Sequence, residues 1–316
     1  MAPSKQVRVA VDGRELTLSN LDKVLYPEAG FTKGQVIDYY TRIAPVLVPH
    51  LRNRPLTLKR YPDGVEGEAF YEKNCPGHRP DWMETAKVWS RHNGRFQYYC
   101  LVQDLPSLVW VANLASLELH TSLSYAERLE EPRQMVFDLD PGPPADVVQC
   151  CQVALWIREI LNEHGLEAFP KTSGSKGLQL YVPLNEDVDY EVTKRASLGI
   201  AQRLAHEHPR EVVHLMERRL RGGKVFIDWS QNDQHKTTVN VYSLRARPRP
   251  TVSTPVSWTE VEQAWNKKDA GLLIFEADSV VRRIDKLGDL FEPVLQARQR
   301  LPEELLRELP ETEPGR

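Results

Sequence analysis

Alternating apolar and polar positions predict a β-hairpin near the start of the chain. Val7, Val9 and Val11 alternate with polar residues, and the alternation resumes at Leu16 after an Asp-Gly pair. Side chains of a strand point to its two faces in turn, and Asp-Gly between two such runs is typical of a type I′ turn. We therefore expect two antiparallel strands joined at residues 12–13.

Helical spacing follows this hairpin. Thr32, with Gln35 three positions on, forms a capping box that opens a helix through Leu47, with Pro45 expected to kink or end it. Helical spacing also predicts a helix over residues 105–119, ending at His120. The remaining pattern predicts strands within 54–75 and at 95–101, 136–140, 166–169, 178–182, 224–229 and 237–243, and helices at 144–164, 190–207 and from 257 onward.

Interleaved strands and helices indicate a mixed α/β domain. The chain has 316 residues, enough to bury a sizeable core as one large domain or two fused ones. The composition, 41% apolar and 27% charged, is typical of a globular soluble protein. The apolar runs are too short to cross a bilayer and the N-terminus has no signal-peptide pattern, so we expect a cytoplasmic protein without a membrane partner.

Charge and cysteine content narrow the possible functional classes of the protein only slightly. The net charge of −3 gives no global case for nucleic acid, but basic clusters occur at residues 218–224, 245–249 and 282–283. A solvated charged face explains any one of them, whereas together they suit a phosphate-binding groove. The cysteines lack C-x-x-C spacing, which predicts reduced thiols and argues against zinc; they are Cys75, Cys100, Cys150 and Cys151.

Two apolar strands carry the candidate chemistry. Asp138 and Asp140 lie two residues apart before a Pro-Gly turn, so they share one face. Like charges this close repel unless a cation lies between them, although two solvated aspartates at a strand end explain the pattern equally well. Asp228 ends a second such strand. If the strands converge, which at this stage is a hypothesis, three carboxylates form a site for Mg²⁺ or Mn²⁺.

A glycine-containing turn lies between these strands. Its glycines allow the backbone to approach an anion, Ser173 can donate a hydrogen bond, and Lys176 supplies charge. It lacks P-loop spacing and leads into a strand, so a surface turn is the alternative. Arg245 follows a later strand and can bind a triphosphate through its fork of donors, or be an ordinary surface arginine.

These segments resemble the polymerase domain of bacterial DNA ligase D, a member of the archaeo-eukaryotic primase superfamily that acts in non-homologous end joining. The resemblance runs roughly from Leu18 to Leu290, and its most specific matches are residues 21–27, 136–142, 172–177, 224–232 and 242–247. It implies a mixed-sheet, primase-like α/β catalytic domain over residues 1–300. The N-terminal α/β extension would cover about residues 1–60, and residues 301–316 would be an acidic tail or linker.

The resemblance also implies residue roles. Asp138, Asp140 and Asp228 would be the catalytic ligands of a two-metal Mn²⁺ or Mg²⁺ site. Nucleotide contacts would come from His120, Ser173, Lys176, Arg221, Gln231, Lys236 and Arg245. DNA contacts would come from Lys23 and Lys33, which grip a downstream 5′-phosphate, from the adjacent Asn20, and from the aromatic pair Phe70 and Tyr71, on which template bases stack.

Several of these residues have simpler interpretations without the family. His120 would be a helix-end histidine stabilised by the helix dipole. Lys23 and Lys33 would be ordinary loop and helix-start lysines, and an aromatic pair in a strand is more often part of a core. In one departure from the family pattern, Gln179 replaces a histidine on the strand after the turn. Glutamine cannot become cationic, so nucleotide binding would be weaker or depend more on Lys176 and Arg245, and we expect activity to be retained.

The resemblance implies a nucleotidyltransferase that extends 3′-ends at gaps and double-strand breaks on a template, with ribonucleotides preferred. Its expected partners are DNA ends and gapped duplex with a 5′-phosphate, NTP or dNTP, the end-binding protein Ku and an ATP-dependent DNA ligase. The expected location is cytoplasmic and nucleoid-associated. The alternatives are a primase-polymerase that starts chains de novo, a non-catalytic end-binding or bridging module, and a nuclease using the same carboxylates. The lysine pair and the nucleotide-binding turn favour the repair polymerase.

Overall fold

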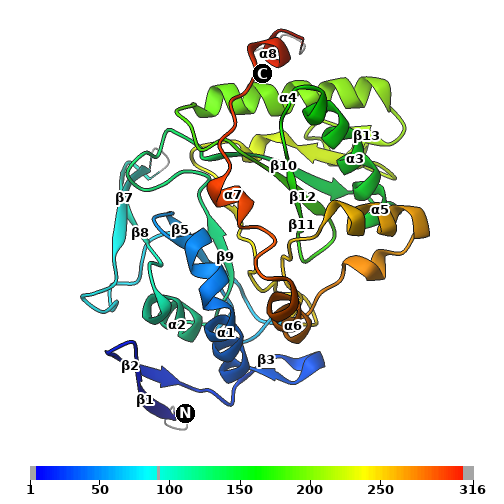
Figure 1. Ribbon diagram of the computed structural model, residues 1–316. Helices are drawn as coiled ribbons and strands as arrows, with labels where there is room; N and C mark the ends of the chain where they lie inside the picture. The colour runs from blue at the N-terminus through cyan, green and yellow to red at the C-terminus, as the bar shows by residue number, and fades with distance from the viewer. Residues whose placement is uncertain (1–4, 91–92, 309–316) are drawn as a thin grey trace. The chain divides into compact units, whose positions relative to one another are not determined.

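The computed structural model describes residues 5–90 and 93–308 (Figure 1). Contacts divide the chain into two compact units, each built from several segments. The first unit comprises Met1–Ser122, Thr237–Ser253 and Phe275–Asp289, and the second comprises Leu123–Lys236, Thr254–Ile274 and Leu290–Arg316. Each unit contains a sheet and helices, which confirms the mixed α/β class. The single domain expected over residues 1–300 stays a prediction.

The N-terminal elements of the first unit follow the sequence pattern closely. Strands β1 (Gln6–Val11) and β2 (Arg14–Ser19) form the predicted hairpin, and the turn residues Asp12 and Gly13 both have positive φ, as a type I′ turn requires. After β3 (Val24–Tyr26) and β4 (Phe31–Thr32), the Thr32 capping box opens α1 (Lys33–Leu51). The helix continues through Pro45 and Pro49 instead of ending there, and its apolar face stays buried to Leu51.

The sheet of the first unit corrects one prediction. Its order is β15 (Thr238–Val239), β9 (Ser116–Thr121), β5 (Leu56–Arg60), β8 (Arg95–Cys100) and β7 (Thr85–Ser90), with β6 (Phe70–Glu72) paired to β5. The helix predicted over residues 105–119 ends at Asn113 as α2 (Leu105–Asn113). Ala115 then takes a positive φ, and the chain continues as β9, where buried Leu117 and Leu119 alternate with Glu118 and His120. His120 is therefore a strand residue, and the helix-dipole interpretation is wrong.

The sheet of the second unit has the order β11 (Phe169–Thr172), β12 (Leu178–Pro183), β10 (Gln134–Pro141), β14 (Val225–Asp228) and β13 (Val212–Val213), and only β13 and β14 pair in parallel. Helices α3 (Val147–Glu163) and α4 (Tyr190–Glu207) pack against β10 (Figure 1). Phe137 and Leu139 are fully buried on one face of this strand, so Asp138 and Asp140 share the other.

The remaining helices follow the prediction with small shifts in their ends. The α3 helix begins later than expected because Asp146 caps it. The C-terminal part forms α5 (Trp258–Lys267), α6 (Ala277–Leu287), α7 (Pro293–Gln296) and α8 (Glu303–Glu308). Leu305 in α8 is buried and α8 contacts α4, so at least the start of the expected tail is packed. Residues 309–316 of that tail lie outside the described residues.

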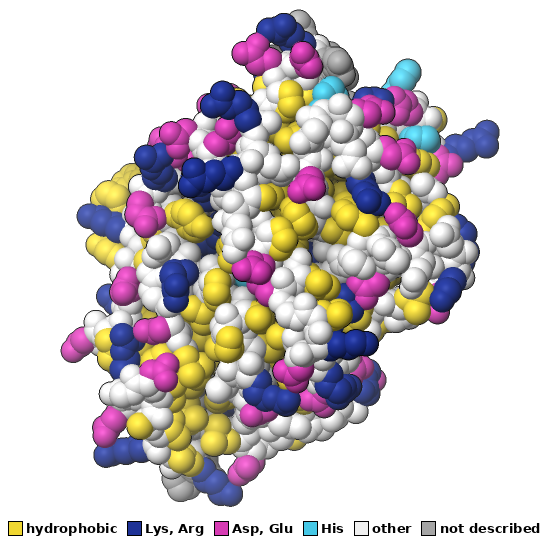
Figure 2. Space-filling view, viewed as in Figure 1, with side chains coloured by type: hydrophobic (Ala, Val, Ile, Leu, Met, Phe, Trp, Pro, Cys, Tyr) yellow, Lys and Arg dark blue, Asp and Glu magenta, His cyan; other side chains and the backbone are white. Residues whose placement is uncertain are grey.

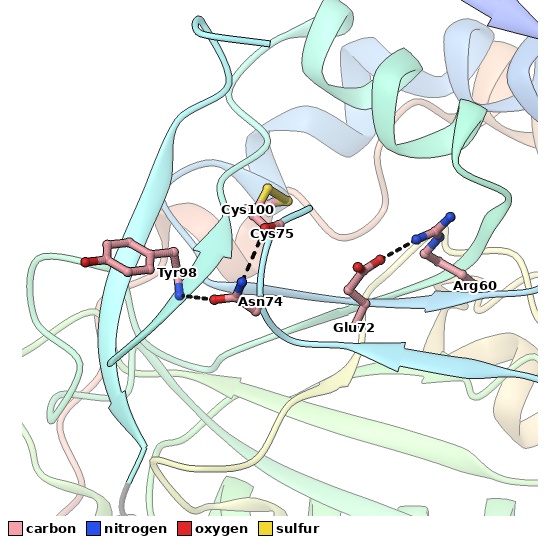
Figure 3. The surroundings of a disulfide bond; sticks show 6 residues. All are labelled: Arg60, Glu72, Asn74, Cys75, Tyr98 and Cys100. Atoms are coloured by element: carbon pink, nitrogen blue, oxygen red, sulfur yellow. Dashed lines mark hydrogen bonds and ion pairs between the residues drawn. A yellow bond between two sulfur atoms is a disulfide. The ribbon is translucent and has the colours of Figure 1, made fainter. Parts of the chain in front are cut away.

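The prediction of four reduced thiols is wrong for one pair, because Cys75 and Cys100 form a disulfide. Figure 3 shows how it joins the segment after β6 to the end of β8. The Cys75 N–H also donates to the Tyr98 carbonyl oxygen at 2.6 Å, and the Asn74 side chain accepts from the Tyr98 N–H at 2.9 Å. Sequence spacing could not reveal the pair, since strand pairing brings the cysteines together. Cys150 and Cys151 are buried free thiols in α3.

Basic and acidic side chains are mixed on one face of the protein (Figure 2). Lys and Arg are interspersed with Asp and Glu over the face shown in Figure 2, as the near-zero net charge suggests. Within the described part of the chain, every helix is too short or too polar to cross a membrane.

Candidate active site

Strand register brings the predicted catalytic carboxylates of the second unit together. Asp138 in β10 is the direct antiparallel partner of Asp228 in β14, and Asp140 lies two residues further along β10. Beyond Asp228 the Asn232 side chain continues the pairing, because its amide accepts from Val136 N at 2.8 Å and donates to Val136 O at 2.7 Å. The hypothesis that Asp228 converges on the D-x-D strand is confirmed at the level of the backbone.

The electrostatics of this cluster favour a bound cation. Burial, followed by the charges of Asp140 and Asp228, raises the pKa of Asp138 to about 7. A hydrogen bond from the Gln179 side chain and the charge of Lys171 oppose this rise. The charges of Asp140 and Asp228 that raise the pKa of Asp138 will equally attract a metal ion.

The donor set fits a divalent metal, although the side chains are not yet in a metal-binding arrangement. Among residues 5–90 and 93–308, no group of three or more His, Cys, Asp or Glu side chains is arranged to hold an ion. Both oxygens of Asp228 are engaged in local hydrogen bonds: Oδ1 accepts from the N–H and the hydroxyl of Ser230, and Oδ2 accepts from Gln231 Nε2 at 2.8 Å. An ionised carboxylate has about four acceptor positions, so these bonds leave one on Oδ2.

A buried lysine that the sequence analysis missed determines how Gln179 is oriented. Lys171 in β11 is fully buried and donates to Gln179 Oε1, and the two residues are direct partners across β11 and β12. A lysine only donates, so the amide oxygen of Gln179 must face it and the NH₂ group is left for Asp138, the partner of Gln179 on the other side. A lysine in a short apolar strand was the only sequence signal for this arrangement.

The hydroxyl of Ser173 and the small size of Gly177 define the turn after β11. Ser173 Oγ accepts from the N–H groups of Ser175 at 3.2 Å and Gly177 at 3.0 Å, so Ser173 shapes the turn. A Cβ at Gly177 would overlap the carbonyl oxygen of Leu139, which places the turn directly against the D-x-D strand. Lys176 is exposed on this turn, as a phosphate contact would require.

The other predicted nucleotide residues of the second unit also lie around Asp228. Gln231 donates directly to its carboxylate, and Lys236 donates to Ser230 Oγ, which in turn donates to Asp228. The Arg221 guanidinium stacks 3.6 Å from the ring of Phe226, the cross-strand partner of Asp140. The structure therefore brings all three beside the carboxylate strands.

The first unit brings together the two lysines predicted to bind a phosphate. The Lys33 N–H donates to the Lys23 carbonyl oxygen at 2.8 Å. Lys33 is buried, and its Nζ donates to the Ser19 carbonyl oxygen at 2.7 Å. Burial, then the charges of Lys23 and Arg60, lower the pKa of Lys33 to about 8. The charge of Lys23 disfavours that of Lys33, so an anion near both would be stabilised, although Lys23 Nζ already pairs with Asp63 Oδ1 at 2.7 Å and a phosphate would compete with that carboxylate. Asn20 shapes the same segment, with a positive φ and a carbonyl oxygen that accepts from the Lys23 N–H.

The predicted aromatic pair is on the surface and not in a core. Phe70 is 48% exposed and Tyr71 is 65% exposed on β6, which is available for base stacking. The rings of Tyr71 and His120 are 6.3 Å apart, and Lys59 lies over the Tyr71 ring. Tyr71 also lines a pocket of about 390 Å³ together with residues 72–77 and Gln97.

His120 and Arg245 meet at a residue that sequence reasoning overlooked. Glu118, two positions before His120 on β9, is 2.9 Å from His120 Nε2 and 3.4 Å from Arg245 Nε. Its carboxylate is buried. The E-x-H spacing on a strand was the available signal, but the segment had been interpreted as a helix.

Comparisons with known proteins agree with this geometry. The family described as LigD, primase-polymerase domain, matches residues 32–291. The chain is 42% identical over 279 residues to the multifunctional non-homologous end joining protein LigD of Mycolicibacterium smegmatis, covering 88% of this chain and 36% of that protein. It is 40% identical over 289 residues to the corresponding Mycobacterium tuberculosis protein, covering 88% of this chain and 37% of that protein. The chain thus spans little more than a third of these relatives.

A solved structure, the polymerase domain of Mycobacterium tuberculosis ligase D in complex with DNA, has a TM-score of 0.81 and 38% identity, and covers 93% of this chain and 99% of that one. The fold class and enzyme class expected from the sequence are confirmed. The carboxylate strands, the turn beside them and the match over most of the chain lead to one assignment: the chain belongs to the LigD primase-polymerase domain family.

Proposed function

We propose that this chain is a template-dependent nucleotidyltransferase that adds nucleotides to 3′-ends at gaps and double-strand breaks. The observation that carries the proposal is the register of β10 and β14, which sets Asp138 opposite Asp228 with Asp140 on the same face. Such a carboxylate cluster beside a glycine turn suits divalent metal and phosphate together. The similar ligase D polymerase domain was solved with DNA, which supports the same class of substrate here.

Asp138, Asp140 and Asp228 are the proposed ligands of Mn²⁺ or Mg²⁺. When bound, such ions would supply activation of a 3′-hydroxyl and charge stabilisation of a departing pyrophosphate. Gln231 and Ser230 donate to Asp228 and so fix the orientation of its carboxylate. Asn232 bonds to the backbone of β10 and so keeps β14 in register with that strand. Gln179 donates to Asp138 and so keeps one of its oxygens oriented.

Phosphate contacts are proposed for Ser173 and Lys176 on the turn and for Arg221 and Lys236 near Asp228. His120 and Arg245, which lie together in the first unit, are proposed to contact the nucleotide as well. The family resemblance suggests a preference for ribonucleotides. Each of these roles uses a donor or a cation, which is what a triphosphate requires.

Lys23 and Lys33, with Asn20 beside them, are proposed to hold the 5′-phosphate on the far side of a gap. Phe70 and Tyr71 are proposed to stack template bases, because stacking on an exposed ring accepts any base. The lysine pair favours break repair over de novo priming, since a chain-starting enzyme needs no grip on a downstream phosphate. Ku and an ATP-dependent ligase are the proposed partners, and the nucleoid is the proposed location.

The test is primer extension on a gapped duplex with and without the downstream 5′-phosphate, comparing rNTP with dNTP and Mn²⁺ with Mg²⁺. We expect extension to be stimulated by the phosphate, and the stimulation to disappear in the Lys23→Ala/Lys33→Ala double variant. Extension that ignores the phosphate would argue against the repair role. Synthesis of new chains without a primer would instead identify a primase.

A further inference from the structure

A buried carboxylate lies at the centre of the basic residues in the first unit. Glu118 is 2% exposed, and its Oε2 is 2.9 Å from His120 Nε2 and 3.4 Å from Arg245 Nε. Its Oε1 is 3.5 Å from Lys59 Nζ and accepts from the Ala246 N–H at 3.1 Å. One carboxylate therefore faces three basic side chains and one backbone N–H.

The protonation state of this cluster follows from its contacts. Burial alone would raise the pKa of Glu118, but the hydrogen bond from His120 and the nearby charges of Arg245 and Lys59 hold it well below its usual range. The carboxylate is therefore ionised near neutral pH, and an ionised carboxylate only accepts hydrogen bonds. The nitrogen of His120 that faces it, Nε2, must carry a hydrogen.

The second ring nitrogen of His120 is then the one left for a ligand. Burial lowers the pKa of His120, and the opposing effect of Glu118 does not overcome it, because Arg245 and Lys59 add to the lowering. His120 is thus neutral in the ligand-free protein above its lowered pKa. With a hydrogen on Nε2, a neutral ring has an acceptor at Nδ1.

We propose that Glu118 is a positioning residue that holds His120 in the Nε2–H tautomer and keeps Lys59 and Arg245 beside it, so that Nδ1 is presented to the phosphates of the nucleotide. The inference rests on the proposed function, in which His120 and Arg245 contact the nucleotide. A phosphate oxygen accepts hydrogen bonds, so it requires a hydrogen on Nδ1. Phosphate binding therefore takes up one proton from solvent at His120, and Glu118 stabilises the imidazolium that forms.

Strand geometry supports a shared face. Glu118 and Lys59 are direct cross-strand partners between β9 and β5, and Lys59 is in turn the partner of Tyr71 on β6. His120 lies two residues from Glu118, so it shares that face, and its ring is 6.3 Å from Tyr71. A neutral or misplaced Glu118 would therefore disturb Lys59, Tyr71 and His120 on this face.

The first experiment observes the tautomer directly. Long-range ¹H–¹⁵N NMR of histidine-labelled protein at pH 8, with His120→Gln to assign the signals, should show a protonated Nε2 and an unprotonated Nδ1. Adding Mg²⁺-ATP should protonate both nitrogens. A wild-type ring with its hydrogen on Nδ1, or one that stays neutral with ATP bound, would overturn the proposal. No polymerase activity is needed for this measurement, so it separates failure of the inference from failure of the proposed function.

The second experiment uses Glu118→Gln, with Glu72→Gln as the matched control. Glu72 pairs with Arg60 at 2.6 Å in the same sheet, but strand alternation places it on the other face. Losing a charge-assisted contact should raise the KM for nucleotide by about tenfold or more in Glu118→Gln, with a smaller change in kcat. The variant should also lose the single His120 tautomer. Equal effects of the two substitutions, or an unchanged tautomer in Glu118→Gln, would show that Glu118 has only a structural role.

Discussion

Reduction of the Cys75–Cys100 disulfide should destabilise the protein by an amount that the structure allows us to calculate. The bond closes a loop with a sequence separation of 25. Chain-entropy arguments give about 3.5 kcal/mol for a loop of that length, mostly from restricting the unfolded chain. If the whole chain unfolds as one cooperative unit, this corresponds to a Tm lower by about 5 °C.

Denaturant unfolding with and without a phosphine reductant measures this difference. The Cys75→Ser/Cys100→Ser double variant should unfold like the reduced wild type and should not respond to the reductant. Thiol titration of the denatured, unreduced protein should count only the two cysteines of α3. Four titratable thiols, or a wild-type unfolding curve that ignores the reductant, would refute the reasoning and restore the interpretation of reduced cysteines.

Further predictions concern the site. Asp138→Ala should abolish nucleotide addition but leave the affinity for 5′-phosphorylated duplex, measured by fluorescence anisotropy, nearly unchanged; continued synthesis would contradict the metal site. Gln179→His should remain active, because a neutral imidazole can accept from the buried lysine and donate to the aspartate, whereas Gln179→Glu loses the donor and should reduce kcat/KM by about tenfold or more. A wild type that is inactive until Gln179→His restores synthesis would disprove this account. Gly177→Ala should raise the KM for nucleotide sharply, since its Cβ would overlap a carbonyl oxygen of β10, while Gly77→Ala, which has open space, should not. Affinity for a 5′-phosphorylated end should fall as pH rises through about 8, because Lys33 loses its proton there; a flat profile up to pH 10 would count against its role.

The sequence was most informative where a local pattern determines the result. The period-two alternation around Asp138 and Asp140 required the two carboxylates to share a face, and the structure has them so. Caps such as Thr32 and Ser257 marked helix starts correctly, because a cap is a contact between residues three apart. The apolar strand ending in Asp228 and the glycine-containing turn were likewise recognisable from local sequence, and the family resemblance then implied their roles.

Local pattern failed at residues 116–121. Leu119 continues the helical spacing of the residues before it, and the alternation of Leu117 with Leu119 is too short to outweigh that spacing. Pairing of β9 with β5 and β15 decided for the strand, and with it the neighbourhood of Glu118 and His120. The spacing of residues along the chain could not by itself distinguish a strand from a helix at this segment.

What the sequence alone determined about this protein is its family, its main elements and the chemical types at its site. Only the tertiary structure decided which of these groups meet: Asp138 with Asp228, Lys171 with Gln179, Glu118 with His120 and Arg245, and Cys75 with Cys100. The physical reason is the distance along the chain over which each kind of contact acts. Alternation and capping act between residues a few positions apart, whereas a buried charge or a disulfide needs a partner that strand register supplies from far along the chain.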